Sequence, residues 1–473
     1  MGSNFFCHNK TDDKVGYSVS ISGDGNRVAV GAPGADGPDV CWDWYGCYSS
    51  SPNMGQVRVY EWSANAWQLM GGIPGGYIGG ASNSELGTSI ALSRDGSRVI
   101  AGAPLHNSCQ SSGSAREYEW NSTSWMQIGS DLTSSCIYNN GYTSGSGRKF
   151  GWSVSMLAEG NHVVVGSGGR YQGFVIVFEW KPDWNMWLQM GLTMNHPNED
   201  YGNNQGYNSY SCYGMPEYGF GNAVSISQYA RGTRVFVGMP LNVEVRVLQM
   251  TTCDDPVTAP EHSSMGDCRS SLPLGTTCQL GCDEGYRLSG LTEGSAVGVL
   301  STAKCLTTWD YYAVENGNWG SWGQTVTMPG DGKRAASGKI DSGGTVDILV
   351  FQRANSTAWE QLGEHITRSG GWSGGYGSEW PHMLSLSGDG SVLAVGYPSD
   401  RVCRVYEWKS GNWTQRGGDI VEPSYSSSYS MWGIAVSLSS DGTRVAVGGL
   451  SGSPDIHIFK FEANEWGQMG NGV

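Results

Sequence analysis

The sequence predicts an all-β fold, because one strand–turn–strand pattern recurs seven times along 473 residues. Each copy has an alternating apolar strand, a glycine turn and a second apolar strand that ends in another glycine. Glycine is abundant, at 72 residues, and only 15% of the residues are charged. Tight turns between short strands need such a composition, since glycine adopts positive φ angles. Seven repeats without a comparable helical period predict a seven-bladed β-propeller.

The repeat is defined by two glycines six residues apart. The first copy starts at Gly16-Tyr17, and its third strand ends at Glu61-Trp62 before a second tryptophan, Trp67. An Asp-Gly turn between two alternating strands is the strongest short-range signal for a hairpin. The seven glycine pairs are Gly25/Gly31, Gly96/Gly102, Gly160/Gly166, Gly232/Gly238, Gly332/Gly338, Gly390/Gly396 and Gly442/Gly448.

The spacing of the copies predicts the domain organisation. The interval after Gly232 is much longer than the others. We therefore expect blades one to four in residues 1–250, a small module in residues 251–310, and blades five to seven in residues 311–473. The module is expected to protrude between blades four and five. Two ring closures stay open: every blade is contiguous, or the final strand at Trp466 completes the first blade.

The twelve cysteines predict disulfides and an oxidising compartment. Cys41 and Cys47 could close a small loop, and Cys109 and Cys136 a larger one. The five cysteines of the predicted module have no CxxC pair and no histidine at metal-ligand spacing, which favours disulfides over zinc. These five are Cys253, Cys268, Cys278, Cys282 and Cys305. No sequence-local partner is evident for Cys7, Cys212 and Cys403.

The copies resemble the FG-GAP-type repeats of integrin α-subunit propellers, on the strength of Gly31-Ala32-Pro33 and Gly102-Ala103-Pro104. They are more similar still to repeats of large extracellular proteins of algae and other protists. The resemblance covers most of the chain and implies the propeller fold. Two departures are Trp380-Pro381 in place of an aromatic–glycine pair, and the lack of an Asp-x-Asp-x-Asp-Gly calcium loop. No cofactor is therefore expected, and calcium has no motif to support it.

The module resembles a sushi (complement-control) module, whose mark is Cys-x-x-Gly-Tyr-x-Leu-x-Gly. The matching residues run from Cys282 to Gly290. The protist version has a sixth cysteine near Gly294, so one of the five cysteines lacks the partner that the resemblance implies. A module this small needs disulfides for stability.

Four Asn-x-Ser/Thr acceptors predict N-linked glycans and a secreted, extracellular protein. Asn121, Asn355 and Asn412 fall in the equivalent turn before the second aromatic position of their blades, and Asn9 precedes the first repeat. The N-terminal residues have no secretory-signal pattern, so we expect a longer precursor. No apolar stretch reaches the roughly 18–20 residues of a membrane span.

Charge and motifs argue against several functions. A net charge of −15 and the lack of a basic cluster argue against nucleic-acid binding. The eight histidines form no catalytic motif, and we interpret His162 and His457 as structural. The repeated aspartates are interpreted as turn residues rather than a carboxylate array. They are Asp24, Asp95, Asp331, Asp389 and Asp441.

Paired tryptophans flank a turn in several blades. They could stack on sugars, but their recurrence in register favours packing between blades. The pairs are Trp62/Trp67, Trp120/Trp125, Trp180/Trp187 and Trp408/Trp413.

Three long loops have the composition of disordered segments, so we expect disulfides, glycans or neighbouring subunits to hold them. They span residues 36–55, 130–148 and 195–218. The leading hypothesis is a non-enzymatic structural glycoprotein that forms a homo-oligomer or homopolymer in a surface appendage, matrix or fibre. The alternative is an adhesion or carbohydrate-binding propeller. A third hypothesis, an enzyme with its site at the central channel, lacks a supporting constellation.

Overall fold

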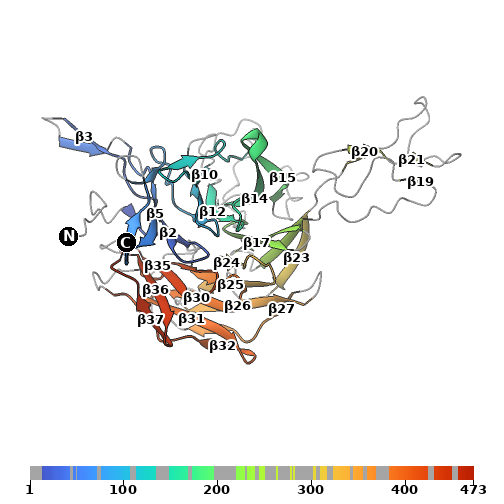
Figure 1. Cartoon of the computed structure of the whole chain (residues 1–473). Helices are drawn as coiled ribbons and strands as arrows, with labels where there is room; N and C mark the ends of the chain where they lie inside the picture. Colours follow the sequence, from blue (N-terminus) through green and yellow to red (C-terminus); the bar gives the residue numbers. More distant parts are fainter. Residues whose placement is uncertain are drawn as a thin grey trace, which may run out of the picture.

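The chain folds into seven antiparallel sheets of four or five strands arranged as blades round a ring (Figure 1). The computed structural model describes residues 13–42, 46–49, 51–71, 76–106, 113–134, 149–168, 173–195, 220–229, 232–239, 244–250, 263–264, 277–279, 281–282, 302–304, 309–316, 323–340, 345–354, 359–368, 383–423, 431–449 and 456–472. The predicted all-β, seven-bladed propeller is confirmed.

Four strands follow one another outward in every blade. Blade one contains β1 (Ser18–Ile21), β2 (Arg27–Ala32), β5 (Gln56–Ser63) and β6 (Ala66–Leu69). Blade two contains β8 (Ile90–Leu92), β9 (Arg98–Ala103), β10 (Ser114–Trp120) and β11 (Trp125–Gln127). Blade three contains β12 (Phe150–Met156), β13 (His162–Ser167), β14 (Phe174–Lys181) and β15 (Met186–Asn195). Blade four contains β16 (Ala223–Tyr229), β17 (Gly232–Met239), β18 (Glu244–Met250) and β23 (Trp309–Asn316).

The remaining blades repeat this order. Blade five contains β24 (Thr325–Thr327), β25 (Arg334–Ile340), β26 (Val346–Arg353) and β27 (Trp359–Gln361). Blade six contains β29 (Leu384–Leu386), β30 (Val392–Tyr397), β31 (Val402–Lys409) and β32 (Asn412–Gln415). Blade seven contains β34 (Ala435–Leu438), β35 (Arg444–Gly448), β36 (His457–Glu462) and β37 (Glu465–Gln468). Short extra strands pair with third strands, namely β7 (Ile78–Gly79), β28 (Ile366–Arg368) and β33 (Ile420–Val421).

The ring closes between contiguous blades. The final strand, β37, pairs with β36 in blade seven, while blade one supplies all its own strands. The first strands of neighbouring blades contact one another round the whole circle, including β1 with β34, and so form the inner wall. In Figure 1 the red strands of blade seven accordingly lie beside the blue strands of blade one.

The inserted segment differs in position from the expectation. Strand β23 pairs with β18 as the fourth strand of blade four, so the segment after Met250 lies within that blade rather than between blades four and five. The boundary expected near residue 310 therefore cuts through β23. The sequence pattern concealed this strand, because β18 lacks the Glu-Trp ending of several third strands and β23 lacks the Trp-x-Gln-x-Gly run of most fourth strands.

Within the segment, the structure describes two short strand pairs. They are β19 (Ser263–Ser264) with β21 (Gly281–Cys282), and β20 (Thr277–Gln279) with β22 (Thr302–Lys304). The rest of the predicted sushi-like module lies outside the described residues.

Close backbone contact between blades explains the strand-ending glycine. A Cβ atom on Gly396 would lie 1.8 Å from the carbonyl oxygen of Gly433 in the next blade. Gly433 itself has a φ of +93°, which side chains other than glycine rarely adopt. The strand-ending glycines of five other blades meet the next blade in the same way. They are Gly31, Gly102, Gly166, Gly238 and Gly448.

A hydroxyl group joins the first strands at all seven junctions. Each hydroxyl oxygen accepts a hydrogen bond from a backbone amide of the next blade, over 2.9–3.4 Å. At the junction of blades two and three, Ala91 replaces the usual hydroxyl residue and Ser89 supplies the bond instead. The pairs are Ser20 with Leu92, Ser89 with Val154, Ser155 with Ile226, Ser225 with Met328, Thr327 with Leu386, Ser385 with Leu438 and Ser437 with Ile21.

A repeated arginine forms a second junction contact. At the start of β9, the Arg98 guanidinium donates a hydrogen bond to the carbonyl of the turn residue Gly160 in the next blade, over 3.1 Å. Equivalent bonds join Arg27 to Gly96, Arg234 to Gly332 and Arg334 to Gly390. Blade six has Val392 at this position, and Arg416 after β32 reaches the Gly442 carbonyl instead, over 3.2 Å.

Candidate functional site

The repeated aspartates act separately, each within its own turn. Asp24 accepts hydrogen bonds from the Ser22 hydroxyl (2.6 Å) and the Asn26 amide (2.9 Å). Burial raises the pKa of this carboxyl, but these hydrogen bonds outweigh burial and leave the pKa below its usual value. Asp95, Asp389 and Asp441 show the same contacts and the same direction of shift. Asp331 accepts a bond from the Lys333 amide. The turn interpretation is therefore confirmed.

The paired aromatic rings pack between blades. Directly opposed rings lie 5.1–5.4 Å apart in five blades, with Phe461 and Trp466 forming the pair of blade seven. The Trp62 ring rests against Gly470 of the neighbouring blade, where an added Cβ would lie 3.0 Å away. The indole N–H groups of Trp67, Trp413 and Trp466 donate to carbonyls of the preceding blade. These rings are used in packing, as predicted.

A polar cluster in blade two contains the residue types of nucleophilic catalysis. His106 Nδ1 lies 2.9 Å from the Ser114 hydroxyl and 3.7 Å from an Asp131 oxygen. A catalytic triad needs opposite nitrogens of the imidazole for serine and carboxylate, whereas here one nitrogen faces both. Ser114 is also fully buried. Burial lowers the pKa of His106, Arg116 lowers it further, and Asp131 opposes them.

Blade six shows that part of this cluster is structural. In blade two, Arg116 binds Asp131 through two nitrogens, at 2.9 and 2.8 Å, and Gln127 binds the same carboxylate. In blade six, Arg404, Asp419 and Gln415 form the same arrangement. Because the repeated unit recurs without the histidine and serine, we assign it to holding the outer strands.

The two strand histidines have structural contacts. His162 Nδ1 lies 3.0 Å from the Asn161 side-chain oxygen, and burial lowers the pKa of His162. His457 is buried, and its Nδ1 lies 3.0 Å from the Gln468 amide nitrogen. The seven first strands, which form the inner wall, carry no carboxylate, histidine, lysine or arginine. The wall described here therefore offers no acid–base pair to a substrate in the channel.

Two predicted glycosylation sites lie on exposed turns between the third and fourth strands. Asn121 follows β10, and its side-chain oxygen accepts hydrogen bonds from the Thr123 amide (3.0 Å) and hydroxyl (2.9 Å). Asn412 begins β32 and is exposed. In an antiparallel meander these turns share one face of the ring with the Asp-Gly turns, while the longer connections lie on the other. Asn9 and Asn355 lie outside the described residues.

The cysteines are described only in part. Cys41 and Cys47 stand directly opposite each other in the hairpin of β3 (Asp39–Trp42) and β4 (Gly46–Ser49). Cys403 in β31 is buried with a free thiol, whose pKa is raised by burial. The backbones of Cys278 and Cys282 lie in β20 and β21. Cys109, Cys136, Cys253, Cys268 and Cys305 lie outside the described residues, as do Cys7 and Cys212.

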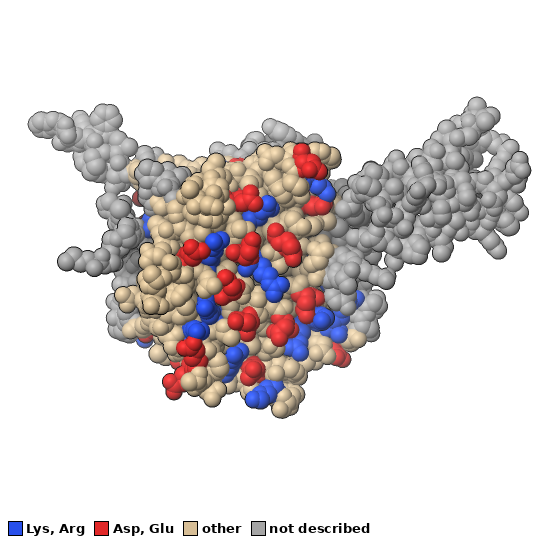
Figure 2. Space-filling model, in the orientation of Figure 1, with Lys and Arg blue, Asp and Glu red and all other residues tan. Residues whose placement is uncertain are grey.

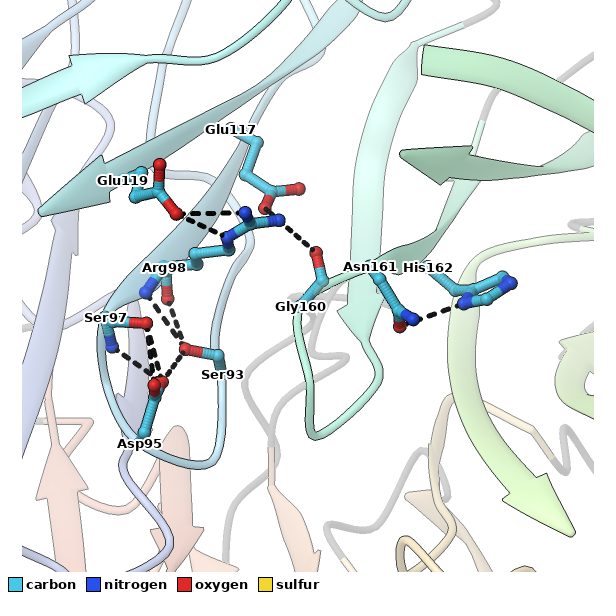
Figure 3. Close-up of polar contacts among 9 residues, drawn as sticks. All are labelled: Ser93, Asp95, Ser97, Arg98, Glu117, Glu119, Gly160, Asn161 and His162. Carbon is cyan, nitrogen blue, oxygen red and sulfur yellow. Dashed lines mark hydrogen bonds and ion pairs between the residues drawn. The ribbon is translucent and has the colours of Figure 1, made fainter. Parts of the chain in front are cut away.

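One buried carboxylate escaped the sequence analysis. Glu117 in β10 is 1% exposed, and neither oxygen has a hydrogen-bond partner among the described residues. Figure 3 shows Arg98 beside it, bound to Glu119 and to the Gly160 carbonyl, with an Arg98–Glu117 separation of 3.8 Å. The sequence did contain a sign that Glu117 is unusual, because the equivalent third-strand position is valine or isoleucine in the other six copies.

The described residues on the face drawn in Figure 2 form no basic patch of the kind that binds nucleic acid. On the face in Figure 2, Lys and Arg side chains alternate with Asp and Glu over the described blades. Among the described residues, no three His, Cys, Asp or Glu side chains gather at a metal-binding spacing. The described part of the chain contains no helix with the length and apolar character of a membrane span.

Seven antiparallel meanders closed into a ring define a β-propeller, and a β-propeller domain is among the solved structures that are similar to this chain. The β-propeller domain of Cps50 (Swd1) from Myceliophteria thermophila matches with a TM-score of 0.50 at 9% sequence identity, covering 95% of this chain and 97% of that chain. This likeness supports the fold alone.

Two further structures are similar at lower scores. Kuenenia stuttgartiensis hydrazine synthase has a TM-score of 0.47 at 10% identity, covering 97% of this chain and 99% of that chain. A periplasmic gluconolactonase of Pseudomonas aeruginosa, PpgL, has a TM-score of 0.45 at 14% identity, with coverage of 88% and 91%. No protein-family model and no curated protein matches the sequence. The FG-GAP and sushi resemblances therefore stay predictions.

Proposed function

We propose that this propeller is a non-enzymatic, extracellular structural glycoprotein whose copies assemble through protein–protein contacts. The observation that carries the proposal is that the repeated polar and aromatic residues have structural roles. Serine hydroxyls, turn aspartates, arginines and paired tryptophans all serve the blades and their junctions. The described first strands, which form the inner wall, contain no Asp, Glu, His, Lys or Arg. Such a ring is a rigid scaffold, and its variable connections on one face are free to serve as contacts.

The predicted glycans support this assignment. Asn121 and Asn412 lie on exposed turns, and the longer connections leave from the opposite face. Glycans on one face would leave the other available for association. Intact-glycopeptide mass spectrometry of native material should find both residues modified. Unmodified asparagine at all four predicted positions would remove the support for an extracellular glycoprotein.

Assembly is tested by the size of the native protein. Analytical ultracentrifugation over a range of concentrations, with electron microscopy of the same sample, should show closed oligomers or fibres. A head-to-tail contact gives a ring when its rotation closes and a fibre when it does not. Protein that sediments as a single chain at high concentration would contradict assembly and favour adhesion.

One observation favours the alternative, a carbohydrate-binding or adhesive propeller. Trp184 is 66% exposed on the 3-10 turn η2 (Pro182–Trp184) of blade three, unlike the tryptophans packed between blades. An exposed aromatic ring is a suitable surface for stacking a sugar. Glycan-array binding that disappears in Trp184→Ala and persists in the control Met126→Ala would support it. Met126 is 54% exposed and belongs to the outer strand of blade two.

A further inference from the structure

Glu117 occupies a position that other blades fill with an aliphatic side chain. In the strand register, Glu117 pairs with Ile100, two residues after the junction arginine of its blade. The same pairing places an aliphatic residue in every other blade, buried to 2% exposure or less. These residues are Val59, Val177, Val247, Val350, Val405 and Ile458.

This position faces the next blade. Five of the aliphatic equivalents belong to clusters that join their blade to the following one, and Ile458 joins blade seven to blade one. Ala115, two residues before Glu117 and on the same side of β10, packs in the cluster between blades two and three. Blade three contributes apolar side chains to that cluster, including Val163, Val165 and Phe178. The carboxyl of Glu117 thus lies at an apolar junction.

The surroundings stabilise an ionised carboxylate poorly. The charged groups that act on it are Arg98 from β9 and Glu119 from β10. Arg98 already donates two hydrogen bonds to Glu119 and one to Gly160, and it approaches Glu117 only to 3.8 Å. His162, at the start of β13 in blade three, is turned away from Glu117 (Figure 3). A buried carboxylate without hydrogen bonds is costly, whereas its protonated form is much less so.

We propose that Glu117 makes the junction between blades two and three sensitive to protons: the junction is tight while the carboxyl is protonated and loosens when it ionises. Burial raises the pKa of Glu117 well above its usual value, Arg98 opposes this effect, and Glu119 reinforces it. A raised folded-state pKa means that the folded chain holds a proton that the unfolded chain has released. Stability is then full below the usual glutamate pKa and is lost as the pH rises through the folded-state value.

Hydrogen exchange of the full chain, corrected for the intrinsic pH dependence of exchange, tests this directly. In the wild type, the opening constant of amides in β10 and β13 should rise at least about threefold from pH 5 to pH 8, because part of the tenfold effect of one unit of pKa shift is already present at pH 5, above the usual glutamate pKa. Amides of β31 and β35, at the junction of blades six and seven, are the internal control. There the equivalent residue is Val405, and no comparable rise is expected.

Two variants distinguish the effect of ionisation at residue 117 from the effect of the size and shape of its side chain. Glu117→Val restores the residue type of the other blades, and Glu117→Gln keeps the size but cannot ionise. Both should abolish the pH-dependent rise in β10 and β13. The proposal is overturned if either folded variant retains that rise, or if the wild type shows an equal rise in all blades. It is equally overturned if the wild-type junction opens no further at pH 8.

Discussion

The backbone amide of Ile21 in the first blade donates a hydrogen bond of 3.1 Å to the hydroxyl oxygen of Ser437 in the last blade. Residues far apart in the chain thereby close the ring through the same contact that joins neighbouring blades elsewhere. Closure therefore needs no special element.

Ser437→Ala should weaken this closure. The Ile21 amide would lose its partner in a part-buried setting, at a cost of about 1–2 kcal/mol in the free energy of unfolding. Chemical denaturation measures the loss. The control is Ser63→Ala, at the exposed end of β5, which should change little. Equal effects of the two substitutions would show that the hydroxyl does not support closure.

Gly396→Ala should be among the most damaging single substitutions. The new methyl group would meet the Gly433 carbonyl at 1.8 Å, so the two blades would have to move apart. We expect a loss near or beyond the upper end of the roughly 1–3 kcal/mol typical of overpacking. Gly338→Ala is the matched control, because the nearest atom there is a side-chain methyl of Thr325 at 2.9 Å. The thermal unfolding midpoint should fall clearly further for Gly396→Ala.

Arg416→Ala should destabilise the junction of blades six and seven. The substitution removes the hydrogen bond to Gly442 and the guanidinium stacked 4.4 Å from the centre of the Phe461 ring. A cost of about 1–2 kcal/mol is expected. Adding Val392→Arg places an arginine where five of the six other blades have one, and should recover part of the loss. No recovery in the double variant would contradict the view that Arg416 substitutes for the missing arginine.

Asp441→Asn should alter the response to acid. The folded-state pKa of Asp441 lies below its usual value, since hydrogen bonds from Ser439 and Thr443 outweigh burial. Its contribution is therefore present above the usual pKa and is lost as the pH falls through the folded-state value. The variant should be less stable than the wild type at pH 7 and approach it by pH 2. A constant difference in the free energy of unfolding at both pH values would refute this.

The cysteines make a chemical prediction. Directly opposed residues of antiparallel strands have Cα atoms about 4.5–5.5 Å apart, within the range of a disulfide. A non-reducing digest should contain a peptide pair joined through Cys41 and Cys47. Cys403 is buried and free, so maleimide should label it only after unfolding. Labelling of Cys403 in the native chain, or a free Cys41, would contradict these expectations.

The glycine spacing predicted the fold because its geometry is local. The six-residue interval sets the length of a hairpin, and six of the seven turn glycines have a positive φ, as at Gly25. The choice between ring closures was beyond the sequence, because the strand at Trp466 could have extended either of two blades. The place of β23 was hidden because pairing with β18 spans the whole insertion.

Some contacts at the blade junctions could not be predicted, because they involve positions where one copy differs from the repeated sequence. Ala91, Val392 and Glu117 each differ from their equivalents, and only the three-dimensional register shows what replaces them. Ser89 and Arg416 compensate for the first two. No described residue forms a hydrogen bond with the Glu117 carboxyl. A comparison of the seven copies could therefore have identified Glu117 as unusual, but it could not have shown that its carboxyl lacks hydrogen-bond partners.

Because the strands of each blade follow one another along the chain, with none from another blade between them, no blade lends a strand to another. Duplication of a single stretch of gene would therefore deliver a complete blade with its own junction hydroxyl and glycine. The insertion in blade four fits the same logic, since extra sequence there emerges between two strands and leaves the six other blades intact. Such a ring can acquire an inserted segment in one blade after another while the first strands that form its inner wall stay the same.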